Sequence, residues 1–344
     1  MSLFDRLLRR TPTAPEGPLD AKGLLHSDLW IDQPDAAAEI DRRVRQGRLT
    51  AEQAEGLRHF VEHGYLTFSL DLPAESFAAL DAEIERLWRD KPDDVAYAFH
   101  GQLKPFSYAE GMAERQPSYR IADLHGTSDA ARELFLHPKV FEWVRLALGL
   151  EPVATQSLTF EFGSQQALHR DPVFVQTHPP SHLVAAWIAL EDIDPRSGPL
   201  VYVPGSHRLP YYQLAPGQHL FDHKKHGPAE SAAMAEFDRA QMAERGMEAV
   251  AFTPKRGEVL LWHHSLLHGG SPSEDLALTR KSFVIHFSSR EHYQRLKQTY
   301  VERVPLPEGG FAERPRIVET ERLLERDGCA GFASPLAEWR SGRR

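Results

Sequence analysis

The stretch Leu183-Val184-Ala185-Ala186-Trp187-Ile188-Ala189-Leu190 is apolar at every position. An uninterrupted apolar run of this length, bounded by turn residues, is typical of a strand buried on both faces. Further β-rich runs lie at 200–203, 258–262 and 281–287, and Gly, Pro and Ser turns separate them. We therefore predict that the region from about 153 to 289 folds as a β-sandwich or jelly-roll barrel.

The chain before this region is predicted to be largely helical. Thr50 and Gln53 have the spacing of a capping box, and Gly64 is a typical helix stop, so a helix is expected between them. Other elements are expected at 65–70 (strand), 76–90 (helix) and about 140–148 (helix). The predicted fold class is α+β with a mainly β core, flanked by N-terminal helices and followed by a C-terminal extension.

Composition excludes several classes of protein. The 344 residues contain 49 acidic and 40 basic side chains, a net charge of −9, which argues against a nucleic-acid-binding protein. The one cysteine, Cys329, can form no intramolecular disulfide and no thiolate zinc cluster. A cytoplasmic location is the simplest expectation.

Length and patterning suggest one catalytic domain with appendages. We expect an N-terminal extension and linker at 1–48, the catalytic domain at 49–300 and a C-terminal extension at 301–344. Within the domain, the polar segment 211–247 is expected to be a lid or a solvated insertion. No apolar segment is long enough to cross a membrane, so we expect no stable membrane insertion. We also expect a monomer or a homodimer.

A His-x-Asp pair is the first chemical signal. His169 and Asp171 lie two residues apart, so on an extended strand their side chains point to the same face and can share one ion. Two imidazoles and one carboxylate bind one face of Fe(II) in many oxygenases and leave the other face open. The third ligand must come from elsewhere, and His263, His264 and His268 are all possible by spacing alone.

Three ordered motifs then carry a resemblance to a known family. The runs 187–192 (Trp-Ile-Ala-Leu-Glu-Asp), 197–200 (Ser-Gly-Pro-Leu) and 204–207 (Pro-Gly-Ser-His) resemble those of the phytanoyl-CoA dioxygenase family, and the similarity covers most of the chain. The resemblance implies a double-stranded β-helix of the cupin type, with Fe(II), 2-oxoglutarate and O2 as cofactors. It also implies that His169, Asp171 and His268 bind the iron.

The resemblance further implies how 2-oxoglutarate is held. Arg280 stands where the family has an arginine for the far carboxylate, and a guanidinium grips a carboxylate through two parallel hydrogen bonds. Gln156 and Trp187 match other cosubstrate positions, although a buried amide and a core indole are the plainer interpretations. By two-residue periodicity, Ser282 shares a strand face with Arg280 and is expected to add a hydroxyl contact. By the same parity, His286 is a possible pocket residue.

The predicted function follows from these residues. We expect an Fe(II)- and 2-oxoglutarate-dependent dioxygenase that hydroxylates a small-molecule substrate and releases succinate and CO2. In related halogenases a small residue replaces the carboxylate ligand, so Asp171 favours hydroxylation. Two alternatives stay open: a cupin-like metal-dependent enzyme that does not use 2-oxoglutarate, and a non-catalytic binding member of the fold. Nothing in the sequence identifies the substrate.

Overall fold

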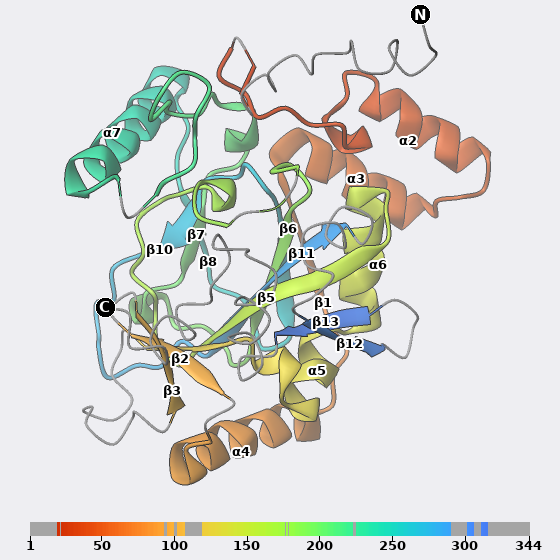
Figure 1. Ribbon diagram of the computed structural model, residues 1–344. Helices are drawn as coiled ribbons and strands as arrows, with labels where there is room; N and C mark the ends of the chain where they lie inside the picture. Colours follow the sequence, from red (N-terminus) through yellow and green to blue (C-terminus); the bar gives the residue numbers. More distant parts are fainter. Residues whose placement is uncertain are drawn as a thin grey trace, which may run out of the picture.

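The structure is a computed structural model (Figure 1). It describes residues 19–20, 22–92, 95–99, 102–106, 119–175, 177, 179–222, 225–289, 301–305 and 311–315. Cys329 and most of the predicted C-terminal extension lie outside these residues.

A large, mostly antiparallel sheet runs through the centre of the described part of the chain. Its strands follow the order β1-β9-β6-β11-β5-β4-β2-β3, while β12 pairs with β13 and β13 pairs in parallel with β5. The bounds are β1 (Tyr65–Ser69), β2 (Ala96–Phe99), β3 (Gln102–Pro105), β4 (Arg120–Ala122), β5 (Pro152–Phe160), β6 (Val184–Ala189), β9 (Glu258–His263), β11 (Ser282–Ser289), β12 (Val301–Pro305) and β13 (Phe311–Pro315).

A smaller antiparallel sheet faces the large one. It has the order β10-β7-β8, formed by β7 (Leu200–Tyr202), β8 (Val250–Phe252) and β10 (His268–Gly270). Aromatic and aliphatic side chains from both sheets, including Trp187, Leu200, Tyr202 and Trp262, form one apolar cluster between them. This arrangement confirms the predicted mainly β core.

The quoted apolar run forms β6 at the middle of the large sheet. All six residues of β6 are buried, as expected for a strand covered on both faces. Its neighbours β9 and β11 place Leu260 and Val284 opposite Trp187. The registers of these two pairings therefore decide which side chains surround Trp187.

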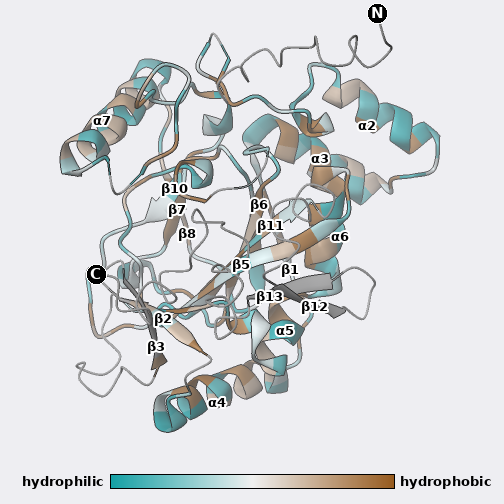
Figure 2. Cartoon of the chain, viewed as in Figure 1, coloured by the Kyte–Doolittle hydropathy of each residue, from teal (hydrophilic) through white to brown (hydrophobic). Residues whose placement is uncertain are grey.

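The helices lie outside the sheets (Figure 1). They are α2 (Ala36–Arg45), α3 (Ala51–His63), α4 (Ala74–Asp90), α5 (Asp129–Phe135), α6 (Pro138–Leu148) and α7 (Pro228–Arg245), with short 3-10 turns η1 (Trp30–Asp32), η3 (Leu124–Gly126), η4 (Asp171–Val173), η5 (Pro195–Ser197) and η6 (Ser206–Arg208). Their outer faces are largely hydrophilic, coloured teal in Figure 2. The hydrophobic segments, coloured brown, lie toward the sheet.

The predicted start and stop of α3 are confirmed. The Thr50 hydroxyl accepts a hydrogen bond from the Gln53 amide over 3.1 Å, and the Gln53 side chain accepts one from the Thr50 amide over 2.8 Å. Gly64 ends the helix with a φ of 79°, a left-handed conformation that favours glycine. Among the described helices, none is long and apolar enough to cross a bilayer.

The chain that precedes α2 packs onto the barrel. Leu19 and Leu25 are buried in one cluster with Val173, Tyr211 and Phe221. Val173 is the last residue of the turn η4, and the two aromatic residues follow β7. The Tyr211 amide also donates to the carbonyl of Gly23 over 2.7 Å. Residues 19–32 therefore contact the part of the chain that carries the His-x-Asp pair.

Candidate active site

His169 and Asp171 lie together, but not on a regular strand as predicted. His169 forms an isolated bridge with His268, and their backbones exchange hydrogen bonds of 2.9 and 3.0 Å. Asp171 begins the turn η4, and Arg170 between them is extended, with φ −116° and ψ 135°. One extended residue is enough to turn the two side chains to the same side.

The structure brings His268 to this pair. The Nε2 atom of His268 lies 3.5 Å from Oδ1 of Asp171, and that of His169 lies 4.0 Å from the same oxygen. One ligand atom from each of the three residues lies within 4.8 Å of the others. The bridge between the backbones of His169 and His268 explains this closeness, although the two residues are far apart in sequence.

Hydrogen bonds fix the tautomers of both imidazoles. Nδ1 of His169 lies 2.9 Å from the Ala167 carbonyl, and Nδ1 of His268 lies 3.1 Å from the Leu266 carbonyl. Because a carbonyl only accepts, each Nδ1 carries the proton and each Nε2 keeps a lone pair. The Gln166 side-chain nitrogen, 3.2 Å from Nε2 of His169, donates to that lone pair.

These donors fit an Fe(II) ion. Two imidazoles and one carboxylate converge, and backbone carbonyls orient both rings, as outer-shell partners of metal ligands do. Burial lowers the pKa of His169 to about 4, so the ring is neutral at pH 7. The Nε2 atoms of both imidazoles already lie within 4.0 Å of Oδ1 of Asp171, so side-chain adjustments would bring the three donors to about 2 Å from one ion.

Asp171 is the centre of a wider set of contacts. Burial opposes its ionisation, but His268 and His286 outweigh that effect and hold the pKa of Asp171 well below its ordinary value. The Trp262 indole donates to Oδ2 over 2.8 Å. Nε2 of His286 lies 3.5 Å from Oδ1. The carboxylate is thus ionised and held on both oxygens.

Arg280 is a buried cation in the same region. It is 2% exposed, and within the described part of the chain it forms no ion pair. Its Nε has no partner, and Nη2 only reaches the Phe162 carbonyl at 3.5 Å. Burial lowers the pKa of Arg280 to about 10, so it is charged at pH 7. A buried, unpaired guanidinium calls for an anionic ligand.

A cavity of about 230 Å³ joins Arg280 to the three candidate ligands. Gln156 from β5 and Trp187 from β6 line it, and His286 does as well. The buried Trp187 Nε1 has no partner, so it is free to donate to a bound molecule. Ser282 is buried, does not line the cavity and donates its hydroxyl to the Arg280 carbonyl at 3.4 Å.

The sequence reasoning missed a second cation of this cavity, Arg120 on β4. Its guanidinium carbon lies 5.6 Å from the centroid of the Phe160 ring, and that of Arg280 lies 5.4 Å from the same ring. Burial lowers the pKa of Arg120. The available signal was the alternation of β4, where Tyr119 and Ile121 are buried and Arg120 falls on the other face.

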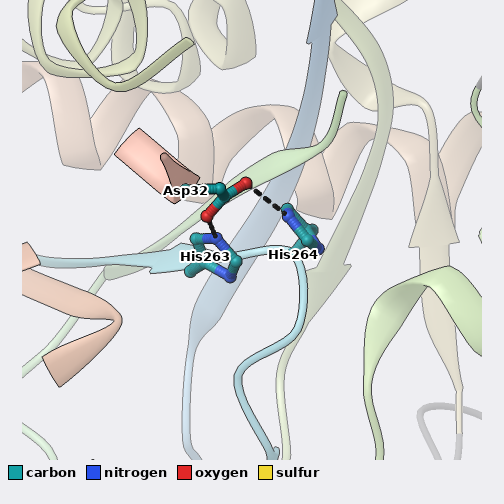
Figure 3. A group of neighbouring side chains, drawn as sticks. All are labelled: Asp32, His263 and His264. Atoms are coloured by element: carbon teal, nitrogen blue, oxygen red, sulfur yellow. Dashed lines mark hydrogen bonds and ion pairs between the residues drawn. The ribbon is translucent and has the colours of Figure 1, made fainter. Parts of the chain in front are cut away.

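His263 and His264 turn away from the cavity. Both rings point to Asp32 at the end of η1, and the carboxylate lies between them (Figure 3). These two residues were alternatives for the third ligand, and the structure places neither beside His169.

The amino-acid sequence from 60 to 280 matches the family described as phytanoyl-CoA dioxygenase. The chain belongs to the phytanoyl-CoA dioxygenase family. This membership confirms the resemblance found in the sequence. The protein is therefore a 2-oxoglutarate-dependent oxygenase, an enzyme whose cofactors are Fe(II), 2-oxoglutarate and O2.

Curated relatives are distant. The peroxisomal phytanoyl-CoA dioxygenase of Homo sapiens is 24% identical over 274 residues, which cover 77% of this chain and 76% of that protein. Phytanoyl-CoA dioxygenase domain-containing protein 1 of Bos taurus is 24% identical over 178 residues, which cover 48% of this chain and 60% of that protein.

A solved structure supports the fold. EctD from S. alaskensis in its apoform is 20% identical, with a TM-score of 0.50, and the match covers 80% of this chain and 84% of EctD. The same enzyme has been solved with 2-oxoglutarate and 5-hydroxyectoine. The likeness confirms the predicted double-stranded β-helix.

Proposed function

We propose that this oxygenase hydroxylates a small-molecule substrate, with oxidation of 2-oxoglutarate to succinate and CO2. The observation that carries the proposal is the single cavity that joins a His-Asp-His set to an unpaired buried arginine. Metal ligands and an anion-binding group that line one cavity are what a chelating dicarboxylate requires.

His169, Asp171 and His268 are the residues that would hold Fe(II). As ligands they would offer two imidazole nitrogens and one ionised carboxylate, and they leave the cavity side open. Bound Fe(II) supplies the activation of O2. Because Asp171 fills the carboxylate position, we propose hydroxylation rather than halogenation.

Arg280 would hold the far carboxylate of 2-oxoglutarate. A guanidinium buried under aromatic rings keeps its charge and offers two parallel donors. Trp187 of β6 would donate its free indole N–H. Gln156 would contribute its side-chain amide from β5, which is separated from β6 by β11. Ser282 would act through the main chain, because its hydroxyl is bonded to the Arg280 carbonyl.

The substrate would enter beside Phe174. This ring is 41% exposed, lies 5.8 Å from the His169 ring and lines two cavities. The second cavity, of about 170 Å³, lies between the His-x-Asp segment and α7. Segment 211–247 thus contributes one helix to the wall of this second cavity, and we propose that it serves as the predicted lid.

The decisive experiment is a screen for substrate-dependent succinate formation. Pools of small molecules are incubated with the protein, Fe(II) and 2-oxoglutarate, first in air and then under ¹⁸O2. A product heavier by one oxygen atom, with the label from O2, supports hydroxylation. A product that has only lost two hydrogens, or that carries no label, refutes it.

Two variants make the screen specific to this site. Asp171→Ala should abolish succinate formation in every pool because the iron is no longer held. Arg280→Ala should keep iron but lose the visible charge-transfer band that 2-oxoglutarate gives when it chelates Fe(II). An unchanged band in Arg280→Ala would refute the assignment of Arg280 while leaving the hydroxylase proposal open to the screen.

A further inference from the structure

A second group of buried titratable side chains lies behind the iron ligands. Oδ1 of Asp32 is 2.7 Å from Nε2 of His263, and Oδ2 is 3.3 Å from Nε2 of His264 (Figure 3). The Ser27 hydroxyl also donates to Oδ2. The two histidines follow one another at the end of β9, whereas Asp32 comes from the chain before α2.

The composition of this group resembles a metal site, but its hydrogen bonds do not. Nδ1 of His263 accepts the backbone N–H of Ser265 at 3.2 Å. Nε2 of His263 must therefore carry a proton, which it donates to Asp32, and it has no lone pair for a metal. His169 and His268 show the opposite pattern, with Nδ1–H bonded to carbonyls and a lone pair on Nε2.

A chain of hydrogen bonds runs from His264 through Ser265 to Tyr211. Its Nδ1 lies 2.6 Å from the Ser265 hydroxyl, which lies 2.8 Å from the Tyr211 hydroxyl. If His264 donates to Asp32 through Nε2, Ser265 donates to His264 and Tyr211 donates to Ser265, so every donor has one acceptor. Burial lowers the pKa of His264 to about 4, which keeps this ring neutral at pH 7.

Both ends of this chain of bonds reach segments that carry iron ligands. The Tyr211 ring lies 4.5 Å under the guanidinium of Arg170, the residue between His169 and Asp171. The turn that begins at His263 contains Leu266, whose N–H bonds to the His263 carbonyl at 2.9 Å. The carbonyl of Leu266 holds Nδ1 of His268.

We infer that Asp32 is a positioning residue for the iron site. It clamps His263 and His264, fixes the turn that orients His268, and through Ser265 and Tyr211 supports the segment 169–171. This inference rests on the proposed assignment of His268 as an iron ligand. The iron site then depends on a segment that lies more than two hundred residues before that ligand in sequence.

The test compares Asp32→Asn with a matched control, Asp28→Asn. Asp28 also joins the N-terminal segment to the barrel, but it does so through another histidine, His182, whose Nε2 lies 2.6 Å away. In Asp32→Asn the introduced amide group opposes the N–H of one histidine, so the clamp is lost at almost unchanged volume. Both variants are titrated anaerobically with Fe(II), then with 2-oxoglutarate, and their melting temperatures are measured without iron.

We expect Asp32→Asn to weaken Fe(II) binding, by less than the roughly 10-fold to 100-fold that follows loss of a group bonded directly to a metal ligand, and to shift the charge-transfer band. Asp28→Asn should bind iron normally at a similar melting temperature. Should Asp32→Asn fail to fold, Ser265→Ala interrupts the same chain of bonds, and its band should shift in the same direction.

Two results would overturn the inference. One is Fe(II) affinity and a band equal to those of the unaltered protein in both Asp32→Asn and Ser265→Ala. The other is a second ion in the unaltered protein that persists in His268→Ala and disappears in Asp32→Asn, which would make the group a metal site. Failure of the triad assignment is seen separately, as normal iron binding by His268→Ala.

Discussion

The indole Nε1 of Trp262 donates a hydrogen bond of 2.8 Å to Oδ2 of Asp171. Trp262 belongs to β9 and Asp171 to the turn η4, so this bond joins the large sheet to the segment that carries two of the candidate ligands. Both side chains are buried. The bond therefore fixes which carboxylate oxygen faces His169 and His268.

Trp262→Phe should weaken Fe(II) binding about 10-fold while the fold is kept. Phenylalanine keeps an aromatic ring at this position, but Oδ2 of Asp171 loses its donor and the carboxylate can rotate. Anaerobic Fe(II) titration measures the effect. Trp143→Phe is the control, because Trp143 is a buried residue of α6 and packs against Phe68 away from the cavity. Equal affinities in the two variants would contradict the positioning role of Trp262.

Arg280→Lys should weaken 2-oxoglutarate binding about 10-fold or more and leave Fe(II) binding unchanged. A lysine keeps the positive charge, but its single ammonium group replaces the planar pair of guanidinium donors. The charge-transfer band, followed as 2-oxoglutarate is added, gives the affinity. Arg256→Lys is a fitting control, because its guanidinium lies over Phe77 and does not line the cavity. An Arg280→Lys protein with normal affinity would show that another group holds the carboxylate.

The sequence predicted what depends on local spacing. The cap of α3 at Thr50, the apolar strand β6 and the His-x-Asp pair all follow from residues a few positions apart. The family resemblance supplied His268 and Arg280, which no periodicity could select.

The contacts made through strand register were not predictable in the same way. His286 reaches Asp171 because β11 pairs with β5 and β6, and Trp262 does so because β9 pairs with β6. Asp32 lies on a segment whose packing against the barrel has no sequence signature. Such contacts depend on which distant strands and segments meet, and a one-residue change of register would remove them.

The metal-free protein should lose stability as the pH falls below about 6.5. Burial lowers the pKa of His264 to about 4 and that of His207 to about 2. Between these values and the ordinary histidine pKa of about 6.5, the unfolded chain binds protons that the folded chain does not, so acid favours unfolding. The free energy of unfolding by urea, measured at several pH values from 7.5 to 4.5, should decrease steadily toward acid.

His207→Gln should flatten this dependence. The glutamine side chain can still donate to the Val61 carbonyl, which accepts from Nε2 of His207 at 3.2 Å, but it does not titrate. His26→Gln provides a control on a histidine that is exposed. A profile whose slope is the same in His207→Gln as in the unaltered protein would mean that other groups cause the acid sensitivity.

Asp238→Asn should release α7 from the wall of the second cavity, next to the His-x-Asp segment. Asp238 pairs with the buried guanidinium of Arg170 at 2.9 Å, and Arg170 lies between His169 and Asp171. Removal of one charge leaves the other buried without its partner, which costs about 3–5 kcal/mol. Hydrogen exchange of residues 228–245 should then become faster. Glu236→Gln, which removes an exposed ion pair with Arg239 on the same helix, should change little.

The comparison of these two variants decides how the lid is held. If the buried pair holds it, opening of α7 requires that Arg170 give up its partner, and opening then also loosens the segment between His169 and Asp171. Exchange that is slow in both variants would mean instead that apolar contacts such as those of Met234 retain the helix. In that case α7 could open without disturbing the candidate iron ligands, and closure of the proposed lid and assembly of the metal site would be independent events.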